Sequence, residues 1–555
     1  MLSFIKNGAN IFRNKQEDIL SAAFVIAFSV ALSRVLGLVR YRLLASYFGD
    51  NIKLLDSFIA ASILPDAIFE VLIFGTIALA FIPVFSQYLS RDKLKKAWEL
   101  SSIMISLGLL VFVVFAAIII VLADFIAPII APGVVAKDPA TSHQIAQLLR
   151  IMIFAQAFFV ISIFMTGILQ SFQRFLVPAL ASVFYNIGII LSIIFLVPVF
   201  GIYAPAIGMI IGALLHLTIQ VPLALSLGFS FRLNFDLNNK DVRETISLMW
   251  PRSISLSLVR ISDMINIALA SIAAVGSIVA FNFAQVLQYV PTAMFAASIA
   301  QASLPSLSIE FNAKRYEQFK KLFTQSFHQI LFLILPAAAI LAILRIPVVR
   351  LVFGARELPW EITVLTGRTL IAFSVGIAAQ AVSLLLTRGF YAIKDSFTPV
   401  KVNIFSITVN IALALFFVLI LKLSLIWLAL AYSTANITNS LLLFILLDKK
   451  VGFDKKKLLA PVAKMSLIGF ITAVFLYVPM KLLDQLVFDT TRTVGLILLT
   501  GIATIVGLSV YILLSWVMRV KEVAIFYHLA KRVLALPSKL TSPAPTSIEA
   551  QEQNP

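Results

Sequence analysis

The sequence predicts an all-α integral membrane protein with about 14 transmembrane helices, and its composition is the first observation behind that prediction. Of the 555 residues, 61% are hydrophobic and only 13% are charged. Soluble globular domains are about 45–50% apolar and about 25% charged, so most of this chain is expected to face lipid. The apolar residues also gather in runs of roughly 20 or more, which suits spanning helices and exceeds the length of barrel strands.

Fourteen such runs follow one another along the chain. We expect spanning helices near residues 22–46, 55–86, 99–124, 146–170, 178–199, 203–227, 246–270, 277–307, 322–345, 366–387, 399–421, 424–447, 459–482 and 493–517. The first run is too long for a signal peptide and lacks a small-residue cleavage site, so we expect it to be retained as a span.

The distribution of basic residues explains the net charge of +18 and predicts the topology. Lys and Arg gather in the amino tail, in the carboxyl tail and in every second loop, for example at 91–96, 314–321 and 448–457. The intervening loops are short and poor in charge. By the positive-inside rule we expect both termini to be cytoplasmic, with some attraction for anionic lipid and no nucleic-acid partner.

An internal duplication organises the spans. Three short motifs recur at offsets of 220 to 222 residues, each at the same place in the helix order. The pairs are residues 38–40 with 258–260, 82–86 with 304–308, and 174–178 with 395–399. Because each repeat holds an even number of helices, the two repeats are expected to be parallel and related by an axis along the membrane normal.

The duplication predicts two pseudo-symmetric six-helix lobes and a leftover helix pair. The predicted regions are an N-terminal lobe (1–227), a cytoplasmic linker (228–247), a C-terminal lobe (248–447), helices 13 and 14 (448–518), and an interfacial helix with a disordered tail (519–555). The interfacial helix, at 520–536, is amphipathic, and the final stretch has the composition of a disordered segment.

No feature of the sequence predicts an enzyme. The four His residues are scattered, Cys is absent, and neither an HExxH nor a Walker-type motif is present. The outer loops are too short to hold a separate catalytic domain. We therefore expect no catalytic residues and no metal site.

Charged side chains inside the predicted spans are the candidates for function, because a charge in a bilayer is costly and usually faces a bundle interior or a watery cavity. The first span carries Arg34 and Arg40, the second begins with Asp56, and the seventh carries Arg252 and Arg260. Arginine binds phosphate oxygens through two parallel hydrogen bonds, so these residues suit a carrier of an anionic head group. Two alternatives stay open: the arginines of the first span snorkel to an interface, and Asp56 favours a helix N-terminus.

A second set of polar residues is a candidate for coupling to an ion. Asp263 and Asn266 lie on the seventh span, and Asn403 and Asn410 lie on one face of the eleventh. We expect them to bind a coupling cation, sodium or a proton, with the membrane potential as an alternative driving force. The structural alternatives are an ion pair between Arg260 and Asp263 and hydrogen bonding between helices by the asparagines.

Seven short segments, spread over most of the chain, together resemble the motifs of a known family. They are SRVLGLVR (33–40), LP (64–65), AFIP (80–83), QSFQRFLVPA (170–179), LPSLS (304–308), AFSVG (372–376) and GFYAIKDSFTPVKV (389–402). Together they resemble the MurJ (MviN) lipid II flippases of the multidrug/oligosaccharidyl-lipid/polysaccharide exporter superfamily. The resemblance implies fourteen helices, translocation of undecaprenyl-diphosphate-linked disaccharide-pentapeptide, and a lipid-tail groove formed by the last helix pair.

The resemblance also bears on the site. It implies that Arg34 and Arg40 are cavity arginines and that Asp56 is a family acid. This chain departs from the family pattern at three pairs of positions. It has Phe69-Glu70 where the family has two arginines, Phe74-Gly75 where the family has Glu-Gly, and Gln285-Val286 where the family has Asp-Arg. We hypothesise that Arg260 and Arg252 supply the missing charge.

The predicted function is therefore that of a lipid II flippase in the bacterial inner membrane, serving peptidoglycan biosynthesis and cell shape by alternating access. Its partners would be the lipid-linked oligosaccharide diphosphate, membrane lipids and other cell-wall synthesis proteins, and it would be a monomer. One alternative is a flippase for another polyprenyl-diphosphate glycan, or a multidrug exporter of the same superfamily. A second is a non-transporting scaffold of envelope synthesis, which would not need water-accessible arginines.

Overall fold

The computed structural model describes residues 19–68, 75–354, 358–490 and 492–524 of the chain. Side-chain surroundings are described from residue 28 onward, apart from 75–80, 248 and 250–256. The predicted disordered tail, most of the predicted interfacial helix and the Phe69-Glu70 departure lie outside the described residues.

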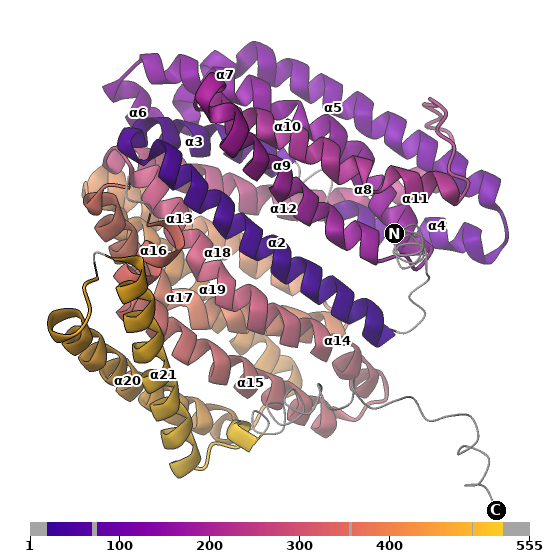
Figure 1. Cartoon of the computed structure of the whole chain (residues 1–555). Helices are drawn as coiled ribbons and strands as arrows, with labels where there is room; N and C mark the ends of the chain where they lie inside the picture. Colours follow the sequence, from indigo (N-terminus) through magenta and orange to yellow (C-terminus); the bar gives the residue numbers. More distant parts are fainter. Residues whose placement is uncertain (1–18, 69–74, 355–357, 491, 525–555) are drawn as a thin grey trace, which may run out of the picture. The chain divides into compact units, whose positions relative to one another are not determined.

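Every regular element in the described part of the chain is helical (Figure 1). In chain order the elements are α2 (Ile19–Phe48), η1 (Gly49–Asn51), α3 (Ile52–Ile68), α4 (Gly75–Ser90), α5 (Leu94–Ile130), α6 (Pro132–Lys137), α7 (Ala140–Ile153), α8 (Ala155–Ser171), α9 (Leu176–Phe200), α10 (Tyr203–Thr218), α11 (Val221–Ser226), α12 (Lys240–Ala273), α13 (Ser277–Pro291), η3 (Thr292–Ala296), α14 (Ala297–Asn312), α15 (Tyr316–Ile343), α16 (Arg345–Phe353), α17 (Trp360–Ala392), α18 (Phe397–Leu415), η4 (Phe416–Ile420), α19 (Leu425–Val451), α20 (Lys455–Leu486) and α21 (Thr493–Val517).

The prediction of an all-α membrane protein is confirmed. Within the described residues, 11 helical segments are long and apolar enough to cross a membrane, and each coincides with a predicted span. The three other predicted spans lie on α2, on α3 together with α4, and on α12. These carry most of the charged residues found inside predicted spans. The count of fourteen spans and the cytoplasmic placement of both termini stay predictions.

Contacts between residues divide the chain into two compact units. Unit 1 comprises Met1–Tyr289, Arg345–Gly376 and Phe397–Asn439, and unit 2 comprises Val290–Leu344, Ile377–Ser396 and Ser440–Pro555. Helices α13, α17 and α19 contribute residues to both. This division follows spatial contacts, whereas the predicted lobes follow the sequence repeat, so the lobe boundaries stay a prediction.

In unit 1, α12 is the central helix, because it packs against α3, α4, α5, α6 and α18. A second tight layer is formed by α9, which packs on α10 and on α2 (Figure 1). Glycines allow the approach of α9 and α10, since a Cβ at Gly188 would lie 2.5 Å from the Cα of Gly212. Small residues at such contacts are typical of helices that pack within a membrane.

Helix α12 begins at Lys240, inside the region 228–247 that was predicted to be a linker. The side chain of Asn239 caps its first turn by accepting backbone N–H groups. Earlier in the same region the N–H of Arg232 donates to the Oγ of Ser102 on α5, at 3.2 Å. The helix therefore begins before the predicted span 246–270, and the linker boundaries stay a prediction.

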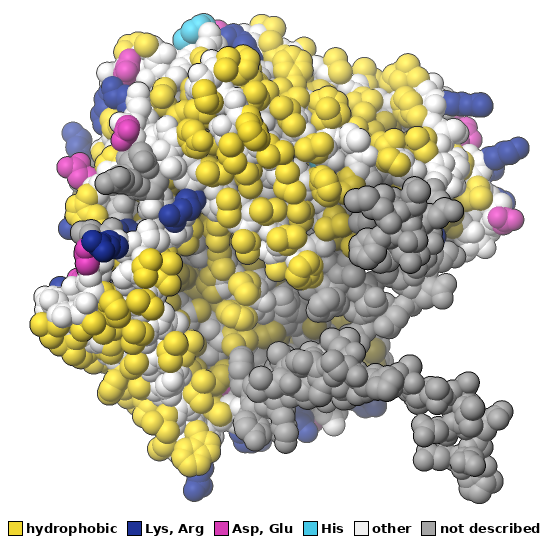
Figure 2. All heavy atoms as spheres, in the orientation of Figure 1, with side chains coloured by type: hydrophobic (Ala, Val, Ile, Leu, Met, Phe, Trp, Pro, Cys, Tyr) yellow, Lys and Arg dark blue, Asp and Glu magenta, His cyan; other side chains and the backbone are white. Residues whose placement is uncertain are grey.

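In unit 2, α15 packs on α20, and α20 packs on α21. The buried hydroxyl of Tyr511 on α21 donates to the carbonyl of Phe332 on α15, at 3.0 Å. Both α20 and α21 expose large apolar side chains such as Phe470 and Trp516. Figure 2 shows the hydrophobic surface that these two helices present, which is the surface expected of helices in contact with lipid.

Candidate functional site

All of the predicted site residues lie in unit 1, on four helices. They are Arg34 and Arg40 on α2, Asp56 on α3, Arg252, Arg260, Asp263 and Asn266 on α12, and Asn403 and Asn410 on α18. The structure arranges them in several separate clusters, which are described in turn.

Arg40 lies where α2, α3 and α9 contribute polar side chains. Its guanidinium carbon is 5.0 Å from the centre of the Tyr41 ring. The Asp66 carboxylate of α3 and the Tyr185 hydroxyl of α9 are its further electrostatic neighbours. The Arg40 side chain is half-buried. We call Arg40, Tyr41, Asp66 and Tyr185 the Arg40 cluster; it holds one cation, one carboxylate and two phenols.

Asp66 and Tyr185 are members of this cluster that the sequence analysis missed. Asp66 directly follows Pro65 inside the second predicted span. A carboxylate in a span is costly unless it has a partner, so its position was a signal that could have found it. Tyr185 offered no comparable signal, because an amphipathic aromatic side chain is unremarkable in a membrane helix.

The two other arginines of α2 have different surroundings. Arg34 is exposed, while its neighbour Ser33 faces α9 and accepts a hydrogen bond from Asn186 at 3.1 Å. Arg42 donates from Nη1 to the carbonyl of Leu351 at 2.6 Å, near the C-terminal end of α16 where carbonyls lack helical partners. Arg42 therefore links two helices of unit 1. The substrate-binding role of Arg34 stays a prediction, and its exposure leaves the snorkelling alternative open.

Arg260 and Asp263 form an ion pair on α12, with 3.0 Å between Nη1 and Oδ2. The two side chains are 30% and 21% exposed, so solvent partly screens the attraction between their charges. Tyr289 of α13 and Tyr432 of α19 lie beside it, and their hydroxyl oxygens are 3.0 Å apart. These four residues form the Arg260 cluster. The structural alternative of an i,i+3 pair is thus present, and the substrate role of Arg260 stays a prediction.

The two clusters have the same composition but different construction. Arg40 and Arg260 occupy equivalent positions of the sequence repeat, and each has one carboxylate and two tyrosines as neighbours. The carboxylate of the Arg40 cluster comes from another helix, α3, whereas Asp263 lies one turn beyond its arginine on α12. The two clusters therefore contain the same kinds of side chain, but the carboxylate comes from a second helix in the Arg40 cluster and from the same helix in the Arg260 cluster.

Asp56 is fully buried and caps α13. Its Oδ2 accepts the N–H of Gly276 at 2.6 Å, and its Oδ1 accepts the N–H of Val279 at 3.0 Å. Gly276 has a φ of +82°, and a Cβ there would lie 2.2 Å from the Ile362 side chain, so only glycine fits this turn. Asp56 does favour a helix N-terminus, but that of α13 instead of its own helix. Its substrate-binding role stays a prediction.

Asp56→Ala is expected to lower the thermal unfolding midpoint of the purified protein, and Asp56→Asn to lower it less. Alanine leaves two buried backbone N–H groups without acceptors, and a hydrogen bond to a charged group contributes about 1.5–3 kcal/mol. Asparagine retains one acceptor oxygen. Thermal unfolding in detergent measures the difference, and an unchanged midpoint for Asp56→Ala would contradict a stabilising cap.

Asn266 and Asn410 form a buried polar contact between α12 and α18. The Nδ2 of Asn410 donates to the Oγ of Ser262 at 3.0 Å and to the Oδ1 of Asn266 at 3.3 Å. Both amides are almost completely buried. Within the described structure the Oδ1 of Asn410 has no hydrogen-bond partner. Asn403 lies seven residues earlier on α18 and is half-buried, so the structure joins two of the three predicted asparagines.

Arg252 also lies on α12, but its side chain is outside the described part of the structure. Among the described residues, no group of three or more His, Asp or Glu side chains is arranged to hold a metal ion. The two arginine clusters and the asparagine contact are therefore the polar sites that unit 1 offers from the predicted residues.

Apolar spanning helices with partly buried arginines, carboxylates and tyrosines define the class of protein, a multi-pass helical membrane transporter. Residues 44–494 match the family model described as "Lipid II flippase MurJ". This match covers most of the chain, and the chain belongs to the MurJ family.

Relatives and solved structures agree with this assignment. The chain is 28% identical over 466 residues to a probable lipid II flippase MurJ of Bdellovibrio bacteriovorus, covering 83% of this chain and 88% of that one. It is 26% identical over 501 residues to a probable lipid II flippase MurJ of Thermotoga maritima, covering 90% and 96%.

Two solved structures share the fold. A lipid II flippase MurJ in an inward closed conformation matches with a TM-score of 0.73 at 23% identity, covering 88% of this chain and 98% of that one. An inward-facing MATE family transporter of the MOP superfamily matches with a TM-score of 0.65 at 14% identity, covering 76% and 94%. At these identities the structural matches show the fold alone.

Proposed function

We propose that the protein is a lipid II flippase, which moves undecaprenyl-diphosphate-linked disaccharide-pentapeptide from the inner to the outer leaflet of the bacterial inner membrane. The observation that carries this proposal is the match of residues 44–494 to the MurJ family model. Within the proposal the carrier is a monomer, works by alternating access, and acts beside the proteins that make and use the lipid-linked precursor.

The geometry of the Arg40 cluster supports this proposal. A guanidinium can form two parallel hydrogen bonds to a diphosphate, and the phenols of Tyr41 and Tyr185 lie beside Arg40 as further donors. Asp66 balances the arginine when no substrate is bound. A diphosphate would compete with that carboxylate for the guanidinium, so binding exchanges one charge-assisted contact for another and the cluster can release its substrate again.

The Arg260 cluster is proposed as a second contact for the head group. Arg260 is held by Asp263 at 3.0 Å, with two tyrosine hydroxyls beside the pair. An incoming phosphate would again replace a carboxylate as the partner of the arginine. This assignment lets Arg260 supply charge that the family pattern places at position 286, where this chain has Val286.

We propose that a monovalent cation drives transport and binds at the contact between Asn266 and Asn410. Amide and hydroxyl oxygens suit such a cation, and the Oδ1 of Asn410 is buried without a hydrogen-bond partner in the described structure. Sodium chloride is then expected to raise the unfolding midpoint relative to choline chloride in the natural protein, because a ligand of the native state stabilises it. Asn410→Ala is expected to remove this difference; a sodium effect that survives the substitution would place the cation elsewhere.

Complementation tests the proposed function. A bacterium depleted of its own lipid II flippase is expected to grow and keep its shape when it produces this protein. The matched negative control is the same strain with the empty vector, and membrane insertion is checked by immunodetection. Failure to complement, despite insertion and correct folding, would favour another polyprenyl-diphosphate glycan, a drug substrate or a scaffold role.

A further inference from the structure

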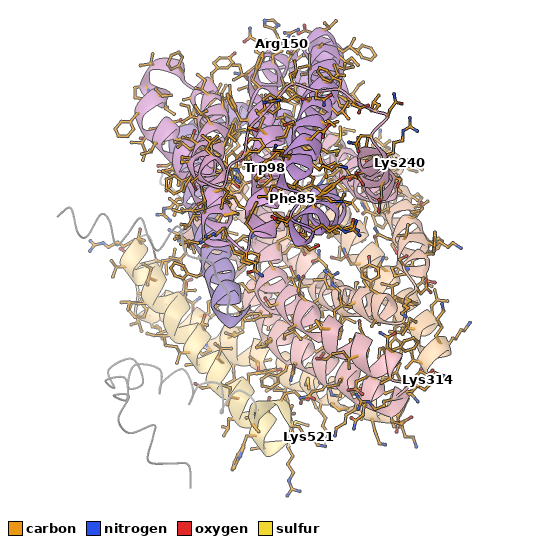
Figure 3. All side chains as sticks on the ribbon, turned by 90° about the vertical axis from the view of Figure 1, so that its right-hand side faces the viewer. Phe85, Trp98, Arg150, Lys240, Lys314 and Lys521 are labelled. Atoms are coloured by element: carbon orange, nitrogen blue, oxygen red, sulfur yellow. The ribbon has the colours of Figure 1, made fainter. Side chains whose placement is uncertain are left out.

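Unit 2 contains a cavity of about 870 Å³ that none of the predicted site residues lines. Three segments form its walls: residues 317–328 of α15, residues 454–464 at the start of α20, and residues 519–522 after α21. Figure 3 shows Lys521, which lines the cavity, at the same end of the unit 2 helices as Lys314, which precedes α15. The cavity therefore lies at the ends of three helices, away from their lipid-facing middles.

The cavity is lined by an excess of positive charge. Seven Lys and Arg side chains line it, against three carboxylates. Two of the lysines are already paired, Lys320 with Glu317 at 2.9 Å and Lys457 with Asp454 at 3.2 Å. Hydrogen bonds from the backbone N–H of Lys457 and, to a smaller extent, from its ammonium group lower the pKa of Asp454. Asp454 is therefore ionised at neutral pH. The remaining cations are Lys321, Lys456, Lys464, Arg519 and Lys521.

A buried contact fixes the third wall. Glu522 lies 3.6 Å from the Nδ1 of His328 on α15, and the two side chains are 10% and 8% exposed. The opposite ring nitrogen, Nε2, is 2.8 Å from the carbonyl of Leu458 on α20. His328 thus contacts all three walls at one point. Residues 519–522 lie beyond the stretch 44–494 that the family model matches.

Apolar side chains place the rim at the level of lipid head groups. Trp516 is 67% exposed and lies one turn before Arg519, and Leu459 is 48% exposed beside Lys456 and Lys457. Tryptophan is enriched where a membrane meets water. The hydrophobic surface of α20 and α21 continues from this level along both helices (Figure 2).

We propose that this cavity binds the phosphate-bearing head group of an anionic phospholipid. A basic pocket between spanning helices is the arrangement that such head groups recognise. Its volume falls within the roughly 300–1,000 Å³ of small-ligand sites. A soluble phosphate compound offers the same chemistry, but the exposed apolar helices that flank the rim favour a ligand with acyl chains. This proposal does not depend on which lipid-linked substrate the carrier moves.

Binding to the full-length protein in detergent tests the proposal, with phosphatidylglycerol as the probe and bound lipid counted by native mass spectrometry. The pocket variant is Lys321→Gln/Lys456→Gln/Lys464→Gln. Each lysine near an anionic lipid contributes roughly fivefold to binding, so the variant is expected to bind on the order of 100-fold more weakly. Its matched control is Lys314→Gln/Lys449→Gln/Lys455→Gln, which removes the same charge from neighbouring positions outside the cavity lining.

The proposal requires saturable binding of phosphatidylglycerol that the control variant keeps and the pocket variant loses. A third variant with arginine at the three pocket positions is expected to keep binding, which separates loss of charge from loss of fold. Equal weakening in the pocket and control variants, or equal binding of phosphatidylcholine, would overturn the proposed site. Pocket-dependent binding of inorganic pyrophosphate without any binding of phosphatidylglycerol would overturn the lipid source.

Discussion

Arg40→Ala is expected to lower lipid II transport at least 10-fold while the protein still inserts and accumulates. The substitution removes the guanidinium of the Arg40 cluster, whose neighbours are Tyr41, Tyr185 and Asp66. One bidentate contact between arginine and phosphate contributes ~1.5–3 kcal/mol, which corresponds to roughly 10- to 150-fold in affinity. Removing that guanidinium also leaves Asp66 to repel the diphosphate. Transport is measured per correctly folded molecule.

Arg42→Ala is the matched control, because Arg42 lies on the same helix but bonds to the carbonyl of Leu351. We expect it to reduce stability and to leave transport per folded molecule unchanged. Arg40→Lys adds a second comparison, since lysine keeps the charge but lacks the planar fork. Near-normal transport by a well-expressed Arg40→Ala protein would support the interpretation that Arg40 snorkels to an interface.

The second large effect is expected from separating Arg260 and Asp263. Arg260→Gln alone removes the 3.0 Å partner of Asp263. Breaking a fully buried pair costs about 3–5 kcal/mol, and the partial exposure of this pair reduces the expected loss of stability to roughly 1–3 kcal/mol. The double variant Arg260→Gln/Asp263→Asn is expected to recover most of that stability, because no unpaired charge remains.

Transport separates the two roles of Arg260. If its guanidinium binds the head group, the double variant regains stability but stays about 10-fold slower than the natural protein. Thermal unfolding and transport measured on the same preparations give both values. Full recovery of transport along with stability would show that Arg260 is only the structural partner of Asp263.

The sequence predicted what depends on local composition and failed where distant segments meet. Apolar runs located the spans, and the three-residue spacing of Arg260 and Asp263 indicated their ion pair before the structure showed it. The partnership of Arg40 with Asp66 joins two helices, and no local pattern encodes it. The same holds for Asp56, which lies in the first half of α3 but caps α13, a helix that starts more than 200 residues later.

The basic cavity of unit 2 is a second site that the local sequence did not predict. The clusters at 314–321 and 448–457 were visible in the sequence as topology signals. Their meeting around His328 required the tertiary contacts to Leu458 and Glu522, which lie 130 or more residues away. The charge runs therefore predicted on which side of the membrane these loops lie, but they did not predict that the loops form a common cavity.

Reconstituted transport tests the central claim most directly. Proteoliposomes that contain the purified protein and labelled lipid II are assayed for exposure of the head group at the opposite leaflet, beside liposomes without protein. The account predicts protein-dependent exposure that undecaprenyl diphosphate inhibits and that Arg40→Ala lowers at least 10-fold. Exposure no faster than in protein-free liposomes, from protein shown to be folded and sealed in the membrane, would contradict it.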